Sequence, residues 1–107
     1  MAVRDIDVAV VRRPDEASIL MISGDIDADA EAALESAWHE AAAGARHVIL
    51  DFTGTSYINS TGIALIVQLL ANARARGIAL TARGLSEHYR TIFEITRLAD
   101  FMTIADV

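Results

Sequence analysis

Residues 47–76, HVILDFTGTSYINSTGIALIVQLLANARAR, decide the fold of this chain. HVILDF is a short and nearly continuous apolar run, which is typical of a central strand covered on both faces of a sheet. A helical apolar pattern extends from about residue 60 to residue 76 and stops at Gly77. We interpret the intervening FTGTSYINS as a loop, with Ser60 at the point where the helix starts. A strand followed by a loop and a helix indicates a βαβ unit.

The composition limits the class of protein. The length of 107 residues fits one domain, residues 1–107, and 53% hydrophobic residues can fill a core of that size. The net charge is -6, so the basic footprint that nucleic-acid binding requires is missing. The chain has no cysteine, which excludes disulfides, thiol nucleophiles and cysteine-based zinc sites. We expect no cofactor.

The N-terminal stretch MAVRDIDVAV carries charges where a signal peptide needs an apolar core. No apolar run approaches the ~18 residues that a membrane-spanning helix requires. We therefore expect a cytoplasmic protein that does not insert into a membrane.

The flanking segments complete the order of elements. VAVVRR and SILMISG, separated by a turn around Pro14, predict a β-hairpin. The segment 24–44 predicts a helix in which Asp27 or Asp29 caps the start and Gly44 follows the end. The residues at helical spacing form one apolar stripe, which consists of Ala30, Ala33, Leu34, Ala37, Trp38 and Ala41.

After the central helix, IALTAR predicts a strand, and SEHYRTIFEITRL predicts a third helix capped by Ser86. FMTIADV at 101–107 predicts a short last strand. The order ββαβαβαβ indicates an α/β fold with a mixed, mostly parallel sheet, an N-terminal hairpin and three main helices. In such a sheet the loops at the carboxyl ends of the strands share one edge, where sites form. We expect GDIDAD, FTGTSYINS and ARGLS to meet there.

An enzyme that uses this edge would need a base beside Ser60. Only His88, early in the third helix, is expected at the same edge, and Asp25 could complete a triad. No nucleophile-elbow motif and no phosphate-binding glycine loop occur in the sequence. A small hydrolase or nucleotide-binding enzyme is therefore the weaker hypothesis.

A regulatory interpretation of Ser60 rests on simpler physics. A helix N-terminus presents unpaired N–H groups and about half a positive charge, so it accommodates a phosphate. Phosphorylation would add about -1.5 to -2 charges. A partner that packs over Ser60 would have to bury that charge, which costs several kcal/mol. One phosphate could therefore dissolve a complex without refolding the domain. The alternative is that Ser60 is a plain helix cap.

Three segments together resemble the STAS family, and within it the bacterial anti-sigma factor antagonists. GDID at 24–27 fits the turn after the second strand of the family. LDFTGTSYINSTGIAL at 50–65 fits the segment that carries the phosphorylated serine, with Ser60 at that position. IFEITRLADFMTI at 92–104 fits the C-terminal pattern. The resemblance covers nearly the whole chain and implies a single STAS-like domain.

The resemblance implies a function without catalysis. Unphosphorylated relatives bind an anti-sigma factor, which is a GHKL-type kinase, and thereby free a sigma factor. The kinase phosphorylates the serine and breaks the complex, and a PP2C-type phosphatase restores it. The residues expected to contact the partner are Asp25, Asp27, Ile58, Asn59, Ser60, Thr61 and Ile63. Other relatives serve as STAS subunits of phospholipid-transport ABC systems or of larger signalling assemblies.

Several of these residues also have structural interpretations. Asp25 and Asp27 fit turn and cap positions, and Ile58 and Ile63 fit either an exposed surface or the core. Gly62 predicts close backbone packing, because glycine costs ~1 kcal/mol in a helix. Asp51 fits a loop-bracing acceptor, and Trp38 fits the core.

One departure from the family pattern concerns Asn59, since relatives commonly carry Asp before the phosphorylated serine. Asn caps a helix about as well as Asp. We predict that Asn59 lowers the repulsion of a phosphate on Ser60. We also predict that it removes a carboxylate that assists either the kinase reaction or the contact with the partner.

Overall fold

The computed structural model describes residues 5–105, and its elements follow the predicted order ββαβαβαβ, with two short 3₁₀ turns in addition. The first four residues of the N-terminal stretch and the last two of the segment 101–107 lie outside the described residues. The elements are β1 (Asp7–Arg12), β2 (Ala17–Ile26), η1 (Ala28–Ala30), α1 (Glu31–Ala42), β3 (His47–Ile58), α2 (Ser60–Ala75), β4 (Ala79–Arg83), α3 (Glu87–Ile95), η2 (Leu98–Asp100) and β5 (Thr103–Ile104).

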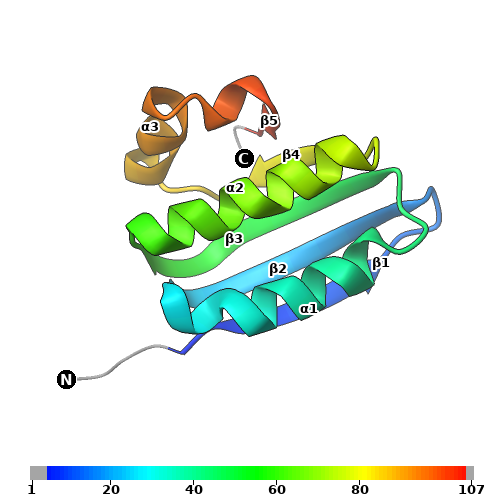
Figure 1. Cartoon of the computed structure of the whole chain (residues 1–107), viewed down its shortest axis with the longest axis horizontal. Coiled ribbons are helices and arrows are strands. Elements are labelled where there is room, and N and C mark those ends of the chain that lie inside the picture. The colour runs from blue at the N-terminus through cyan, green and yellow to red at the C-terminus, as the bar shows by residue number, and fades with distance from the viewer. Residues whose placement is uncertain (1–4, 106–107) are drawn as a thin grey trace.

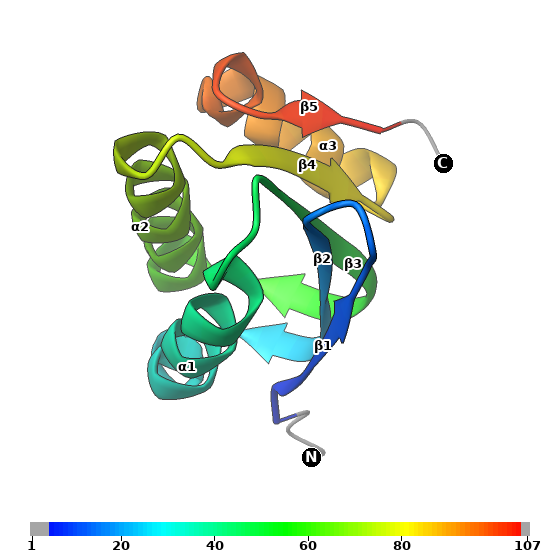
Figure 2. The same cartoon turned by 90° about the vertical axis from the view of Figure 1, so that its right-hand side faces the viewer.

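The five strands form one sheet in the order β1-β2-β3-β4-β5. The β1–β2 hairpin is antiparallel, and the three pairs that follow are parallel, as the sequence predicts. Figure 1 shows α1 and α2 side by side along the sheet, and Figure 2 shows both on the same face of it. The α/β fold with a mixed, mostly parallel sheet is therefore confirmed.

The prediction that β3 is covered on both faces is wrong. Val48, Leu50 and Phe52 are buried under the helices, but the alternating His47, Ile49 and Asp51 are only half-buried. The strand order explains this difference. Each crossover from β2 onwards moves to the next strand in the same direction, and right-handed crossovers that advance in one direction place their helices on one face.

Both central strands are longer than predicted. β2 continues through the expected turn to Ile26, and β3 continues through the expected loop to Ile58. Two register irregularities, between Met21 and Ser23 and between Gly24 and Asp25, allow the ladder to continue. A side chain on Gly54 would place its Cβ 2.7 Å from the Ser23 Cβ, so the close approach of the strands depends on glycine.

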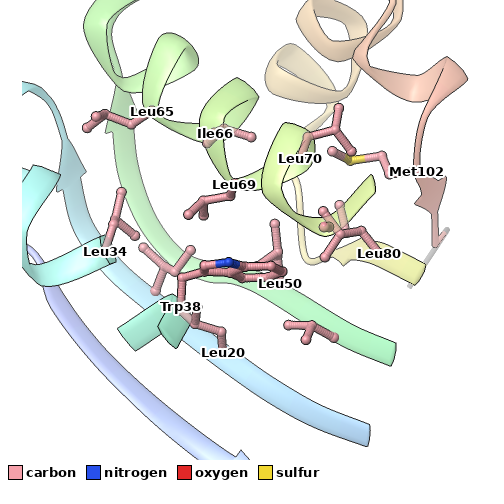
Figure 3. Close-up of a cluster of buried hydrophobic side chains, with 14 of the residues drawn as sticks. Leu20, Leu34, Trp38, Leu50, Leu65, Ile66, Leu69, Leu70, Leu80 and Met102 are labelled. Atoms are coloured by element: carbon pink, nitrogen blue, oxygen red, sulfur yellow. The ribbon is translucent and has the colours of Figure 1, made fainter. Parts of the chain in front are cut away.

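The core lies between the sheet and α1 and α2. The predicted stripe of the first helix faces inward, with Leu34 and Trp38 almost fully buried. Figure 3 shows Trp38 near Leu69 of α2 and the sheet residues Leu20 and Leu50. None of the helices within residues 5–105 has the length and apolar character needed to cross a bilayer.

Candidate functional site

Ser60 is the first residue of α2, at the carboxyl edge of the sheet, and its side chain is exposed. Asn59 is the N-cap, and its Oδ1 accepts a hydrogen bond of 2.8 Å from the Gly62 N–H. The cap on this helix is therefore Asn59, which leaves the Ser60 hydroxyl unused as a cap. No hydrogen bond to the Ser60 side chain occurs within residues 5–105.

The neighbouring strand β2 brings Asp25 to the same edge, and Asp27 follows directly after that strand. In the β2–β3 ladder Asp25 pairs with Tyr57, and Ile26 pairs with Ile58, directly before Asn59. The Asn59 N–H donates to the Ile26 carbonyl over 3.2 Å, which ties the start of α2 to the end of β2. Asp25 is half-buried at this edge.

Asp27 has a structural role at the start of the first helix. Its Oδ1 accepts from the Asp29 N–H at 3.0 Å and caps the 3₁₀ turn Ala28–Ala30, which leads into α1. The predicted choice between Asp27 and Asp29 as the cap is therefore decided for Asp27. Its side chain is still half-buried at the edge.

The four remaining predicted contact residues differ in exposure. Thr61 is exposed, whereas Asn59 and Ile63 are half-buried. Ile58 is only 5% exposed and belongs to the core, so its side chain does not form an apolar contact surface at the edge. Ile58 ends β3, and its side chain points into the core beside that strand, which explains its burial. The sequence did not single out Tyr57, which is 54% exposed, because the strand was not expected to continue that far.

Close packing fixes the start of α2 against the sheet. A Cβ on Gly62 would lie 2.0 Å from the Ile26 carbonyl oxygen, a separation that no side chain tolerates. The predicted close-packing role of Gly62 is therefore confirmed. From the other side, the Ile58 N–H donates to the Tyr89 hydroxyl of α3 over 2.9 Å.

Asp51 has the predicted bracing role, but it braces the continuing strand β3 that leads to the site, where the sequence predicted a loop. Its Oδ1 accepts from the backbone N–H and the hydroxyl of Thr53, and its Oδ2 accepts from Arg83 of β4. Burial raises the pKa of Asp51, but these hydrogen bonds outweigh burial and hold the pKa below its ordinary value. Asp51 is therefore a structural anion.

The three residues that a hydrolase would need, Ser60, His88 and Asp25, are not linked by hydrogen bonds within the described residues. His88 is exposed, and its ring makes an edge-to-face contact with Tyr89, with 4.9 Å between the ring centroids. No hydrogen bond links His88 to Ser60 or to Asp25 within the described part of the chain. The nucleophile–base pair that acyl transfer requires is therefore not formed in this structure.

Comparisons with known proteins agree with the resemblance. A model of the family described as "Mlab, STAS domain" matches residues 9–104. Over 58 residues the chain is 38% identical to the anti-sigma-B factor antagonist of Listeria monocytogenes. That match covers 54% of this chain and 51% of the relative, and the Listeria innocua antagonist matches to the same extent. The chain thus spans about half the length of the curated relatives it matches.

Solved structures share the fold. The crystal structure of an anti-sigma factor antagonist from Mycobacterium paratuberculosis has a TM-score of 0.75 at 21% identity, covering 96% of this chain and 87% of that one. The antagonist SpoIIAA in its unphosphorylated form has a TM-score of 0.70 at 16% identity, covering 94% and 89%. At such identities these likenesses establish the architecture alone. Because the family model matches almost the whole of the described sequence, the chain belongs to the STAS domain family.

Proposed function

We propose that this chain is an anti-sigma factor antagonist whose complex with an anti-sigma factor is broken by phosphorylation of Ser60. The observation that carries the proposal is the exposed Ser60 hydroxyl at the start of α2, capped by Asn59 and free of hydrogen bonds within residues 5–105. A hydroxyl in this position is open to a visiting kinase. The names of the Listeria relatives, both anti-sigma-B factor antagonists, support the same role.

The N-terminus of α2 suits a phosphate. The first turn of α2 contains no acidic residue, so no carboxylate of the helix repels an incoming anion. The unpaired N–H groups and the partial positive charge of the helix end favour it. We expect the free domain to accept the modification without refolding, so that the cost falls on the complex.

The surface around Ser60 completes the proposed docking site. Asp25 and Asp27 on one side add negative charge, and Thr61 and the half-buried Ile63 lie on α2. Asn59 contributes to the docking site by capping α2, and its side-chain amide is not an exposed contact group. A partner that is cationic opposite the two aspartates fits this surface, and steering by opposite charge speeds encounter.

The pathway partners follow from the same proposal. The anti-sigma factor would be a GHKL-type kinase that transfers the phosphoryl group of ATP to Ser60, and a PP2C-type phosphatase would remove it. The chain itself would act as a substrate and catalyse nothing. Because these partners work on transcription, we place the proposed complex in the cytoplasm.

The test is phosphorylation followed by binding. The chain is incubated with candidate anti-sigma kinases and ATP, and mass spectrometry locates the phosphate, which we expect on Ser60. Ser60→Ala should stay bound to the kinase. Ser60→Asp should bind at least about tenfold more weakly, because burying an unpaired charge costs several kcal/mol.

The matched control is Ser36→Asp, which adds the same charge at an exposed serine of α1. It should bind like the unmodified chain. A phosphate found elsewhere, or equal binding of Ser60→Asp and Ser60→Ala, contradicts the proposal.

A second candidate is a STAS subunit of a phospholipid-transport ABC system. We keep this candidate because the description of the matching family model, "Mlab, STAS domain", does not name an anti-sigma pathway. Such a subunit, or a component of a larger signalling assembly, needs no phosphoserine cycle. Copurification with a permease and an ATPase, with Ser60→Asp retaining the complex, would favour this role over the sigma pathway.

A further inference from the structure

A groove separates α1 and α2 on the outer side of the helical layer. The two helices run in the same direction from the edge that holds Ser60 (Figures 1 and 2). The cavity between them has a volume of about 270 Å³. It is lined by Glu31, Leu34, Glu35, Trp38, His39, Leu65, Gln68, Leu69 and Asn72.

The floor of the groove is apolar. Figure 3 shows Leu34 and Trp38 of α1 close to Leu65 and Leu69 of α2. The only polar atom of the indole, Nε1, donates to the Asn72 Oδ1 over 2.7 Å. The polar requirement of Trp38 is therefore met inside the protein. The four apolar side chains of the floor are nearly buried, so an incoming side chain meets their exposed edges together with Gln68 and Asn72.

The α1 wall of the groove is negatively charged. Glu31 and Glu35 lie one helical turn apart and are both exposed. Like charges at this spacing repel each other. No ion pair or hydrogen bond to either carboxylate occurs within residues 5–105, and no arginine lines the cavity. The groove therefore combines an apolar floor with two carboxylates that have no ion-pair partner in the described part of the chain, and His39 lines the same wall.

We propose that this groove binds a basic segment of a partner protein through an arginine or lysine side chain. The aliphatic stem of that side chain lies on Leu65 and Leu69, and its head group lies between Glu31 and Glu35. Long cationic side chains combine an apolar stem with a charged tip in this way. An arginine fork pairs with carboxylates through charge-assisted hydrogen bonds, so arginine fits best. The net charge of -6 favours the same class of partner.

This site is separate from the proposed phosphoserine switch. The groove is lined by α1 and by residues 65–72 of α2, and Ser60 is not among its lining residues. A basic segment can occupy it whether or not Ser60 is a substrate. The two proposals therefore succeed or fail independently.

The experiment uses the single tryptophan of the chain as the reporter. A 16-residue amphipathic helical peptide of leucine and arginine is titrated into the full chain. The readouts are the fluorescence of Trp38 and the NMR signal of its indole N–H. The comparison peptide carries glutamate at every arginine position. We expect saturable changes at Trp38 with the basic peptide and none with the acidic one.

The variants Glu31→Gln and Glu35→Gln remove the charges at constant size. Each should weaken the basic peptide about two- to five-fold, as for exposed ion pairs, and added salt should reduce the difference. The matched control is Glu40→Gln, an exposed position of α1 outside the groove, which should change binding far less.

Three results would overturn the proposal: a Trp38 signal that does not respond to the basic peptide, equal binding of the acidic peptide, or a double glutamine variant that binds like Glu40→Gln. Ser60→Asp serves as the independent check and should leave the Trp38 response unchanged. Loss of the phosphoserine switch with an intact Trp38 response would refute the proposed function alone.

Discussion

Gly62→Ala should destabilise this protein, although helix propensity alone predicts the opposite. Alanine is favoured over glycine inside a helix by ~1 kcal/mol. In this structure, however, the added Cβ would lie 2.0 Å from the Ile26 carbonyl oxygen and 3.0 Å from the Ile58 Cγ2. The nearest obstacle is a backbone atom, which cannot rotate away. The start of α2 must therefore move from β2 by about 1 Å to reach even a tight contact of 3.0 Å.

The magnitude follows from these two opposing terms. Inserting a methyl group into a closely packed site costs about 1–3 kcal/mol, and a clash with fixed backbone belongs at the upper end. After the gain in propensity, we expect the free energy of unfolding to fall by about 2 kcal/mol. The same movement strains the 3.2 Å hydrogen bond from the Asn59 N–H to the Ile26 carbonyl, so the segment that presents Ser60 shifts as well.

Urea unfolding monitored by circular dichroism measures the change, and Ala64→Gly is the matched control. Ala64 is exposed on the same helix, so its replacement costs only the propensity of ~1 kcal/mol and leaves Ser60 in place. On the proposed function, Gly62→Ala should also slow phosphorylation of Ser60, whereas Ala64→Gly should not. A Gly62→Ala variant that is as stable as the parent, or more stable, would refute the packing argument.

Two further predictions concern residues near the site. Asp51→Asn should lower the free energy of unfolding by about 1–3 kcal/mol at pH 7, because Thr53 and Arg83 lose a charged acceptor. Since folding lowers the pKa of Asp51, its stabilisation is complete above the unfolded pKa of about 3.9 and is lost as the pH falls through the folded value. The difference between variant and parent should therefore vanish in acid, and a pH-independent difference in urea unfolding contradicts this reasoning. On the proposed function, Asn59→Asp should raise the turnover of the kinase at Ser60 and increase repulsion in the phosphorylated product; equal rates in a kinase assay would exclude a role for that carboxylate.

Local signals in the sequence predicted the elements well. The hairpin around Pro14, the cap at Ser86, the pair of candidate caps Asp27 and Asp29 and the glycine after the first helix each depend on one or two neighbouring residues. The inward stripe that contains Trp38 follows from helical spacing. Such features are decided within one turn, so tertiary structure had little opportunity to override them.

The misjudged features depend on contacts between distant segments. β3 runs through a glycine- and threonine-rich stretch because β2 pairs with it across two register irregularities, and Gly54 permits the approach of Ser23. The burial of Ile58 follows from that extension. Ile49 is only half-buried because the strand order places the helices on the other face of the sheet. The apolar run of β3 contains no information about that order. These features require knowledge of the partner strand.

The arrangement around Ser60 determines how a phosphate would act on the proposed complex. Asn59 caps the helix, Gly62 packs on the Ile26 carbonyl, and the Ile58 N–H is held by Tyr89. These three contacts on one short segment leave little freedom for the junction between β3 and α2 to rearrange when a charge is added. A switch that worked by refolding would have to break these contacts first, and the helix end already favours the anion. The effect of the phosphate must then be a loss of binding free energy at the surface above Ser60, because a partner would have to desolvate the charge there. Loosening a tie, as Gly62→Ala does, should therefore weaken the contrast between the two phosphorylation states as well as the fold.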